Sequence, residues 1–145
     1  MNILVINGPN INLLGVREPE IYGNETFDDL LAYLKNYASG TGDRLIFFQS
    51  NHEGAIIDFI QKNYTVADGI VINPGAYSHY SYAIYDCLLS VPIQAVEVHL
   101  TNIHERERFR NLSVTAPACI ATVIGKRFSG YAEAIEILRK RGSSK

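Results

Sequence analysis

Five short apolar runs recur along this chain, and stretches with helical periodicity alternate with them. The runs cover residues 3–6, 45–48, 69–72, 95–98 and 118–124. Short continuous apolar runs bounded by turn residues are typical of strands that are buried on both faces. Because helical stretches separate them, they predict right-handed crossovers and one parallel sheet. We therefore expect an α/β fold, a flavodoxin-like three-layer sandwich with a five-stranded parallel sheet.

The helical stretches have recognisable starts and inward faces. Thr26 can cap a first helix that ends at Gly40-Thr41-Gly42, and Asn51 can cap a second. A third covers residues 78–89, with Ala83, Ile84 and Leu88 facing inward. The charged stretch 104–111 predicts one short helical turn, and residues 131–141 predict a final helix before a frayed tail at 142–145.

The length and charge of the chain limit the classes of function. A chain of 145 residues fits one domain, which we expect to span residues 1–145. A net charge of -2 gives no reason to expect nucleic acid or a membrane as a partner. Cys87 and Cys119 lack metal-type spacing and are interpreted as packing residues. The N-terminus lacks the pattern of a signal peptide, so we expect a cytoplasmic protein.

All four histidines follow an apolar run or lie in the loop after one: His52, His79, His99 and His104. In open α/β sheets, ligands bind at the carboxyl ends of the strands. Imidazole transfers protons near neutral pH better than any other side chain. The pattern therefore predicts an acid–base enzyme with its site at that edge of the sheet.

The segment between Gly8 and Gly23 is long and has neither a helical nor a strand period. Such segments in compact domains are often active-site lids, and we expect a lid over residues 8–23. Within it, Arg17 could stabilise the phenolate of Tyr22 and make it a general base. From the loop alone, a solvated arginine and a packing tyrosine remain the simpler interpretation.

Glu97 and His99 end the fourth apolar run two residues apart. Side chains at that spacing share one face of a strand. A carboxylate beside an imidazole orients the ring and favours its protonated form, which suits a general acid. A lone buried ion pair is the competing interpretation, but charged pairs at such positions concentrate in functional sites.

Two further segments offer polar groups. Asn73 follows the third run in an Asn-Pro-Gly turn and is, taken alone, more simply a turn former, while His79 could merely start the next helix. The mixed charges of residues 104–110 predict a solvated face or subunit contact, with one arginine reaching a substrate. Spacing does not say which arginine that is.

Two other chemistries have weak support. Ser78 and Ser81 could suggest a hydrolase, but the chain contains no GxSxG motif. Two histidines and a glutamate could ligate zinc, but no HExxH or comparable spacing is present. A non-catalytic, flavodoxin-like binding module is a third alternative, and its flavin-binding version would be yellow.

Five motifs then stand in a distinctive order: NGPNINLLG at 7–15, REPEIYG at 17–23, QSNHEG at 49–54, INPGAY at 72–77 and VEVHL at 96–100. With these motifs the chain resembles the type II 3-dehydroquinate dehydratases of the shikimate and quinate pathways, from Ile3 to about Leu138. The resemblance implies reversible dehydration of 3-dehydroquinate to 3-dehydroshikimate through an enolate. It implies no metal, no organic cofactor and no Schiff-base lysine.

The resemblance also implies roles for individual residues. Tyr22 would be the base, Arg17 would stabilise its phenolate, and Asn10 would hold a water near the enolate oxygen. His99, oriented by Glu97, would protonate the departing hydroxyl. The substrate would be bound by a further set: Asn73, His79 and Arg110 at the ring hydroxyls, and the backbone N–H groups of Leu100 and Thr101 at the carboxylate.

Assembly is implied in the same way. The resemblance implies a homo-oligomer, a dodecamer built from trimers, in which Asp86 would reach into a neighbouring site. Tyr85 stands where the family often has arginine, and Thr101 stands where serine is common. The first difference affects the expected subunit contact, while the second preserves a hydroxyl. The resemblance leaves open whether the role is biosynthetic or catabolic.

Overall fold

The sheet of the molecule is five-stranded and entirely parallel. The computed structural model describes residues 1–16 and 18–142. Its strands are β1 (Asn2–Asn7), β2 (Arg44–Gln49), β3 (Gly69–Asn73), β4 (Gln94–His99) and β5 (Ala121–Ile124). They lie in the order β2-β1-β3-β4-β5, and every neighbouring pair is parallel. The predicted α/β class and parallel sheet are confirmed.

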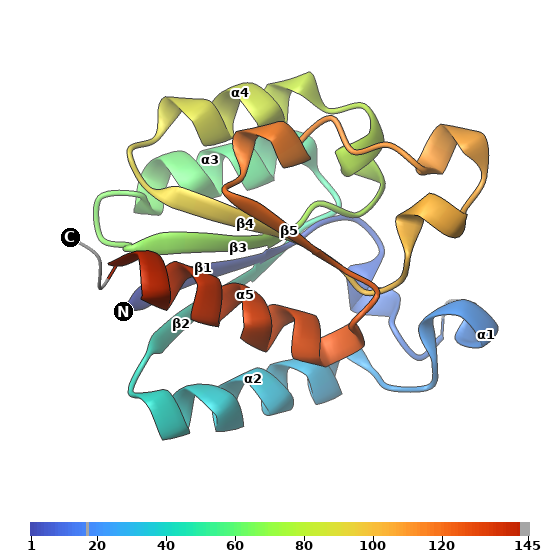
Figure 1. Cartoon of the computed structure of the whole chain (residues 1–145), viewed down its shortest axis with the longest axis horizontal. Helices are drawn as coiled ribbons and strands as arrows, with labels where there is room; N and C mark the ends of the chain where they lie inside the picture. Colours follow the sequence, from blue (N-terminus) through green and yellow to red (C-terminus); the bar gives the residue numbers. More distant parts are fainter. Residues whose placement is uncertain (17, 143–145) are drawn as a thin grey trace.

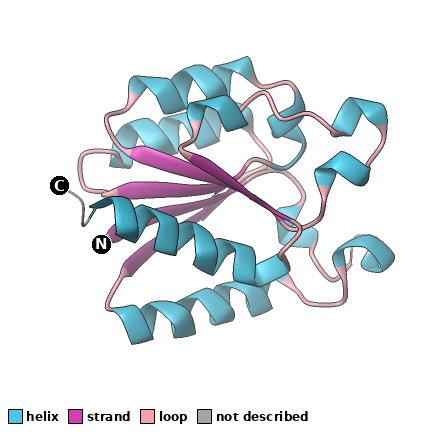
Figure 2. Ribbon diagram, in the orientation of Figure 1, coloured by secondary structure: helices cyan, strands magenta, loops and turns pink. Residues whose placement is uncertain are grey.

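Helices cover both faces of this sheet and complete the three layers (Figures 1 and 2). On one face lie α2 (Phe27–Thr41) and α5 (Arg127–Gly142), and on the other lie α3 (Glu53–Asn63) and α4 (Tyr82–Ser90). In β1, Ile3 and Val5 pack under the first pair of helices, while Leu4 and Ile6 pack under the second. The strands are apolar without a break because alternate side chains enter two different cores.

The connections at the carboxyl edge of the sheet hold only short elements. They comprise α1 (Pro19–Tyr22) and four 3-10 turns, at Ile11–Leu13, Gly75–His79, Ile103–Glu105 and Arg108–Arg110, whereas a fifth turn, Ala116–Ala118, precedes β5 and packs against α4. The described residues of the expected lid segment therefore contain one 3-10 turn and one four-residue helix. Figure 1 shows α1 and the turns after β4 projecting beyond the sheet at this edge. The site is assembled here.

Several predicted boundaries were wrong, each for a local reason. The expected helix 78–89 is two elements, because the Ser78 hydroxyl donates to the Gly75 carbonyl while Ser81 caps a new helix at Ile84 N–H. In α4, Cys87 is buried in place of the expected Ala83. The N–H groups of Ala118 and Cys119 donate to the Thr115 and Ala116 carbonyls in a 3-10 turn, so β5 begins only at Ala121.

The predicted start of α2 was confirmed, whereas the predicted boundaries of other helices were wrong. Thr26 caps α2 in a reciprocal capping box with Asp29, as its sequence predicted, and α2 continues through Gly40 to end at Gly42. The N-cap of α3 is His52, since the Asn51 side chain instead accepts from Asn10 N–H and the Gln49 amide. The charged stretch 104–111 takes part in two 3-10 turns, and α5 begins four residues earlier than expected.

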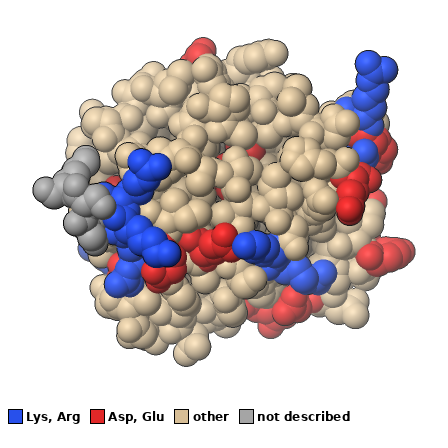
Figure 3. Space-filling view, viewed as in Figure 1, with Lys and Arg blue, Asp and Glu red and all other residues tan. Residues whose placement is uncertain are grey.

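Two observations describe the helices and one face of the molecule. Among the helices of the described residues, none has the length and apolar character needed to cross a membrane. On the face drawn in Figure 3, basic side chains gather beside the C-terminal end and acidic ones lie among them, while most of that face is uncharged.

Candidate active site

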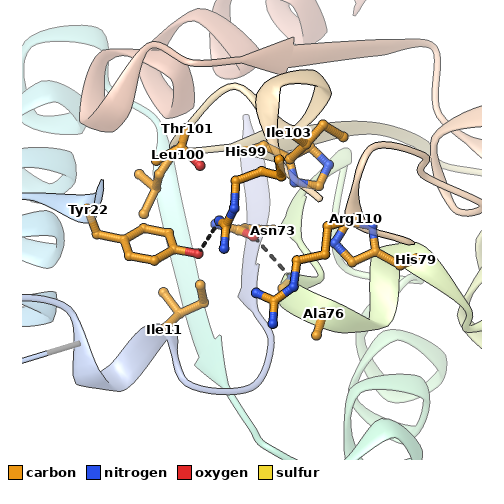
Figure 4. Close-up of a pocket in the computed structure, with 12 residues that line it drawn as sticks. Ile11, Tyr22, Asn73, Ala76, His79, His99, Leu100, Thr101, Ile103 and Arg110 are labelled. Carbon is orange, nitrogen blue, oxygen red and sulfur yellow. Dashed lines mark hydrogen bonds between the residues drawn. The ribbon is translucent and has the colours of Figure 1, made fainter. Parts of the chain in front are cut away.

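One pocket opens at the carboxyl edge of the sheet, where open α/β folds place their ligands. Its volume is about 490 Å³, including the part open to solvent, which is the size of a small-molecule site. Figure 4 shows Tyr22 facing His79 and Arg110 across it. The pocket is lined by Ile11, Tyr22, Asn73, Gly75, Ala76, His79, His99, Leu100, Thr101, Ile103, Arg106 and Arg110.

The end of β4 supplies an imidazole with a buried carboxylate behind it. His99 Nε2 lies 2.6 Å from Glu97 Oε1, and the two side chains are 6% and 0% exposed. Val96 and Val98 point into the core under α2 and α5, so the alternation of the strand places Glu97 and His99 on the opposite face. The contact predicted from their spacing is present, and it brings the imidazole to the pocket.

Two hydroxyl groups complete the surroundings of this carboxylate. The Ser113 hydroxyl donates to Glu97 Oε1 at 2.6 Å, and the buried Thr115 hydroxyl donates to Oε2. Three donors therefore converge on one buried carboxylate, which is the environment that compensates an ionised group for its loss of water. An ionised carboxylate only accepts hydrogen bonds, so His99 Nε2 carries a hydrogen.

The opposite wall carries a phenol beside a guanidinium. Tyr22 ends α1, and Arg106 Nη1 donates to its hydroxyl oxygen at 2.7 Å. The hydrogen bond to Tyr22 is the largest cause that raises the pKa of Arg106, so this guanidinium remains charged. A charged donor at a phenol oxygen stabilises the phenolate. Arg17, which the sequence assigned to this task, lies outside the described residues.

A buried amide network forms the floor of the pocket. Asn7 and Asn73 end β1 and β3 side by side, and the Tyr131 hydroxyl lies between their side chains. That hydroxyl donates to Asn7 Oδ1 at 2.6 Å and accepts from Asn73 Nδ2 at 3.0 Å. Burial raises the pKa of Tyr131, so the group stays a neutral donor. Asn73 Oδ1 in turn accepts from Gly75 N–H at 3.1 Å, which orients the amide toward the pocket.

The segment after β4 closes the site from above and is pinned by two imidazoles. His79 Nδ1 lies 2.7 Å from the Leu112 carbonyl, and His104 Nδ1 lies 3.1 Å from the Asn111 carbonyl. A carbonyl only accepts, so both Nδ1 atoms donate. In His79 this leaves Nε2 as the second ring nitrogen, in a side chain that lines the pocket. The segment carries Arg106 and Arg110 as well.

Comparison with known proteins identifies the family to which this chain belongs. The family model for class II dehydroquinase matches residues 1–139. The chain belongs to the class II dehydroquinase family. It is 56% identical over 139 residues to the 3-dehydroquinate dehydratase of Clostridium acetobutylicum, covering 96% of each chain. The crystal structure of the type II dehydroquinase from Butyrivibrio crossotus superposes with a TM-score of 0.94 at 53% identity, covering 96% of this chain and 97% of that one.

A second curated relative and a second structure agree. The 3-dehydroquinate dehydratase of Clostridium perfringens is 55% identical over 146 residues and covers all of both chains. The type II dehydroquinase of Propionibacterium acnes superposes with a TM-score of 0.91 at 40% identity, covering 96% of each chain. The resemblance inferred from the motifs is therefore confirmed, as are the flavodoxin-like fold and the assignment to a family of hydro-lyases.

Of the eleven predicted site residues, Arg17 lies outside the described residues, and the other ten fall into three groups. Seven line the pocket together: Tyr22, Asn73, His79, His99, Leu100, Thr101 and Arg110. Glu97 lies directly behind His99. Asn10 and Asp86 are exposed and are not among the lining residues. Asn10 adopts a left-handed backbone with φ 67, and its N–H donates to Asn51 Oδ1.

The four histidines end or follow strands at the carboxyl edge of the sheet, as the sequence predicted, but only two of them line the pocket. His79 and His99 line the pocket, whereas His52 begins α3 and His104 holds the segment after β4. The two serines considered as nucleophiles have structural roles, since the Ser78 hydroxyl donates to a backbone carbonyl and the Ser81 hydroxyl donates to Glu53. Both serines are buried, so the hydrolase interpretation is not supported.

The sequence analysis did not identify the residues that bind Tyr22 and Glu97 from distant positions in the chain. Arg106 was one of three equivalent arginines in a charged stretch, and nothing in its spacing marked it as the partner of Tyr22. Ser113 and Thr115 looked like ordinary loop hydroxyls. Their signal was indirect: a buried carboxylate at Glu97 needs several donors, and only a search for those donors would have found them.

Proposed function

We propose that this chain dehydrates 3-dehydroquinate to 3-dehydroshikimate through an enolate, with Tyr22 as the base and His99 as the acid. One observation carries the proposal. A single pocket brings together a phenol with a charged guanidinium at its oxygen and an imidazole backed by a buried carboxylate. Elimination of water from a β-hydroxy ketone requires both functions, a base at the α-carbon and an acid for the departing hydroxyl.

The base would act first. The Tyr22 phenolate takes a proton from C2 of the substrate, and the electron pair of the broken C–H bond moves into the ketone to form an enolate. Arg106 is positioned for this step because its guanidinium stabilises the phenolate before the proton moves. Arg17 would support the same charge, and Asn10 would hold a water at the enolate oxygen.

The acid would complete the reaction. The enolate collapses, the C1–O bond breaks, and the leaving hydroxyl takes a proton from His99 to depart as water. Glu97 holds Nε2 of the ring, so Nδ1 is the nitrogen that delivers the proton. Electron pairs and protons then balance: one C–H bond and one C–O bond break, and one C=C bond and one water form.

The remaining lining residues suit a polar, anionic ring. Asn73, His79 and Arg110 would bind the ring hydroxyls, and the N–H groups of Leu100 and Thr101 would bind the carboxylate. Arg110 also adds a positive charge to the pocket that favours an anion. Asp86 would reach into the site of a neighbouring subunit within a dodecamer built from trimers. The enzyme would be cytoplasmic and would use no metal or organic cofactor. Its 8–23 segment would close over the substrate as a lid.

Ultraviolet absorbance tests the proposal. Metal-stripped protein is mixed with 3-dehydroquinate, and a parallel sample contains borohydride, which traps imines. We expect absorbance from the conjugated product to rise equally in both samples. The absence of a rise from folded protein would contradict the proposed function, and a rise abolished by borohydride would contradict the enolate route without an imine.

A further inference from the structure

Arg127 begins α5 with a backbone conformation that side chains rarely adopt. Its φ is 51, in the left-handed region that favours glycine. Its N–H donates to the Leu100 carbonyl at 3.1 Å, and Gly125 N–H donates to the His99 carbonyl at 3.0 Å. The turn between β5 and α5 is therefore attached to the chain segment that carries the acid.

The Arg127 side chain reaches the opposite wall of the site. Its Nη2 donates to the backbone carbonyl of Tyr22 at 2.6 Å, across 105 positions of sequence. Its Nε lies 3.6 Å from Glu25 Oε2, in an ion pair that is half exposed. Such an exposed pair adds little by itself, so the hydrogen bond to Tyr22 is the contact that matters.

Gly23 makes room for this guanidinium. A Cβ atom at residue 23 would lie 1.7 Å from Arg127 Nη2, and Gly23 has φ 81. Any side chain there would displace the arginine. The backbone directly after Tyr22 is thus shaped around the Arg127 guanidinium, and the strained backbone of Arg127 aims the guanidinium at it.

The helix that carries Tyr22 needs such an external anchor. It has four residues, none of them buried, and helices this short do not persist by themselves in water. Arg106 holds the phenol of Tyr22, while Arg127 holds the carbonyl of the same residue. Two arginines from distant segments therefore hold Tyr22, one at its side-chain oxygen and the other at its backbone carbonyl.

We propose that Arg127 is a positioning residue that anchors α1 and holds the Tyr22 phenol at the pocket, an inference that rests on the proposed role of Tyr22 as the base. Arg127 is not among the residues that line the pocket. It acts through Tyr22 alone, so its loss should lower kcat and leave KM nearly unchanged, because the proposed ring-binding residues lie on other segments.

Arg127→Gly is the decisive variant, because glycine accepts the left-handed backbone without strain. We expect kcat to fall about tenfold, since small misplacements of a catalytic group are costly, while KM stays within about twofold and the melting temperature does not fall. Hydrogen exchange at the amides of Ile21, Tyr22 and Gly23 should accelerate. Arg127→Lys should recover part of kcat, because its ammonium can donate one hydrogen bond.

Lys126→Ala is the matched control, since Lys126 is the adjacent exposed cation and pairs with Glu133 instead. It should leave kcat and the exchange of residues 21–23 unchanged. If the wild-type protein is active and Arg127→Gly shows normal kcat or normal hydrogen exchange at α1, the proposal is overturned. Wild-type protein that does not dehydrate 3-dehydroquinate overturns the proposed function instead, and with it the catalytic half of this inference.

Discussion

The two walls of the active site are built in different ways. The acid wall rests on β4, a strand paired on both sides, and Glu97 there is fully buried with three hydrogen-bond donors around it. The base wall rests on α1, a four-residue helix without buried residues, whose Tyr22 is held by arginines from two distant segments. The acid is therefore fixed by the fold itself, whereas the base is fixed by a few side-chain contacts.

This difference predicts how each wall responds to damage. Removing a partner from the acid wall leaves a buried polar group unsatisfied, so activity and stability should fall together. When a hydrogen-bond partner of Tyr22 is removed from the base wall, water can take the place of that partner. Activity should therefore fall while the free energy of unfolding is retained. Substrates must enter and leave between the walls, and the less deeply anchored wall is the one that can move.

The largest effects are expected at Tyr22 and His99. Tyr22→Phe and His99→Ala should each lower kcat by about 10²- to 10⁴-fold, the usual contribution of a general base or acid. They should differ in stability: His99→Ala deprives buried Glu97 of a donor and should cost about 2 kcal/mol, while Tyr22→Phe should cost little. Steady-state kinetics and urea unfolding measure both effects. Equal losses of stability would contradict the contrast between the walls.

Arg106 should give the next largest effect. Arg106→Gln removes the charge at the Tyr22 oxygen and should lower kcat about 100-fold, comparable to the loss of one transition-state donor. Unfolding free energy should change by no more than about 1 kcal/mol, because the side chain is 14% exposed in a pocket open to water and glutamine can still donate to the phenol oxygen. Arg108→Gln, an exposed neighbour that does not line the pocket, is the control and should retain full activity.

Thr115 should give a smaller loss of rate with a measurable loss of stability. Thr115→Val removes one donor from Glu97 while preserving shape, and should cost about 1 to 3 kcal/mol and lower kcat about tenfold through misorientation of His99. Thr115→Ser should restore both. Thr122→Val makes the same change at an exposed position of the neighbouring strand β5 and should alter neither. A stable, inactive Thr115→Val protein would contradict this view of the acid wall.

The smallest effect is expected at Cys119 and concerns chemical labelling and stability, with no change in activity. Burial, with the nearby Glu97 charge as a lesser cause, raises the pKa of its thiol to about 12. At pH 8 the reactive thiolate is therefore scarce, and iodoacetamide should not label Cys119 within an hour. The stability from this burial should decline as the pH rises from about 8.5, the ordinary thiol value, toward 12. An Ile21→Cys thiol, exposed on α1, should be labelled rapidly, and equally rapid labelling of Cys119 would contradict the raised pKa of its partly buried thiol.

The division between what was predictable and what was not follows the same two walls. The acid pair was predictable because Glu97 and His99 lie on one strand, and strand geometry alone places i and i+2 together. The strands themselves were predictable because continuous apolar runs must enter two cores. The capping of α2 by Thr26 was predictable for a similar reason, since its hydrogen bonds are local.

Long-range contacts were not predictable. Arg106 and Arg127 lie 84 and 105 positions from Tyr22, and no local pattern relates them. Arg127 is a further case, because its left-handed backbone has no signal in the sequence and the predicted helix began only at residue 131. The resemblance to a family supplied the role of Tyr22, which the loop pattern alone did not favour.

Deuterium exchange at C2 of the substrate tests the division of labour between the walls most directly. In D₂O, proton NMR follows loss of the C2 signal of 3-dehydroquinate in the presence of His99→Ala or Tyr22→Phe protein. If Tyr22 forms the enolate before His99 acts, His99→Ala should still exchange this proton while failing to release water, and Tyr22→Phe should do neither. Exchange by Tyr22→Phe at the wild-type rate would contradict the assignment of the base.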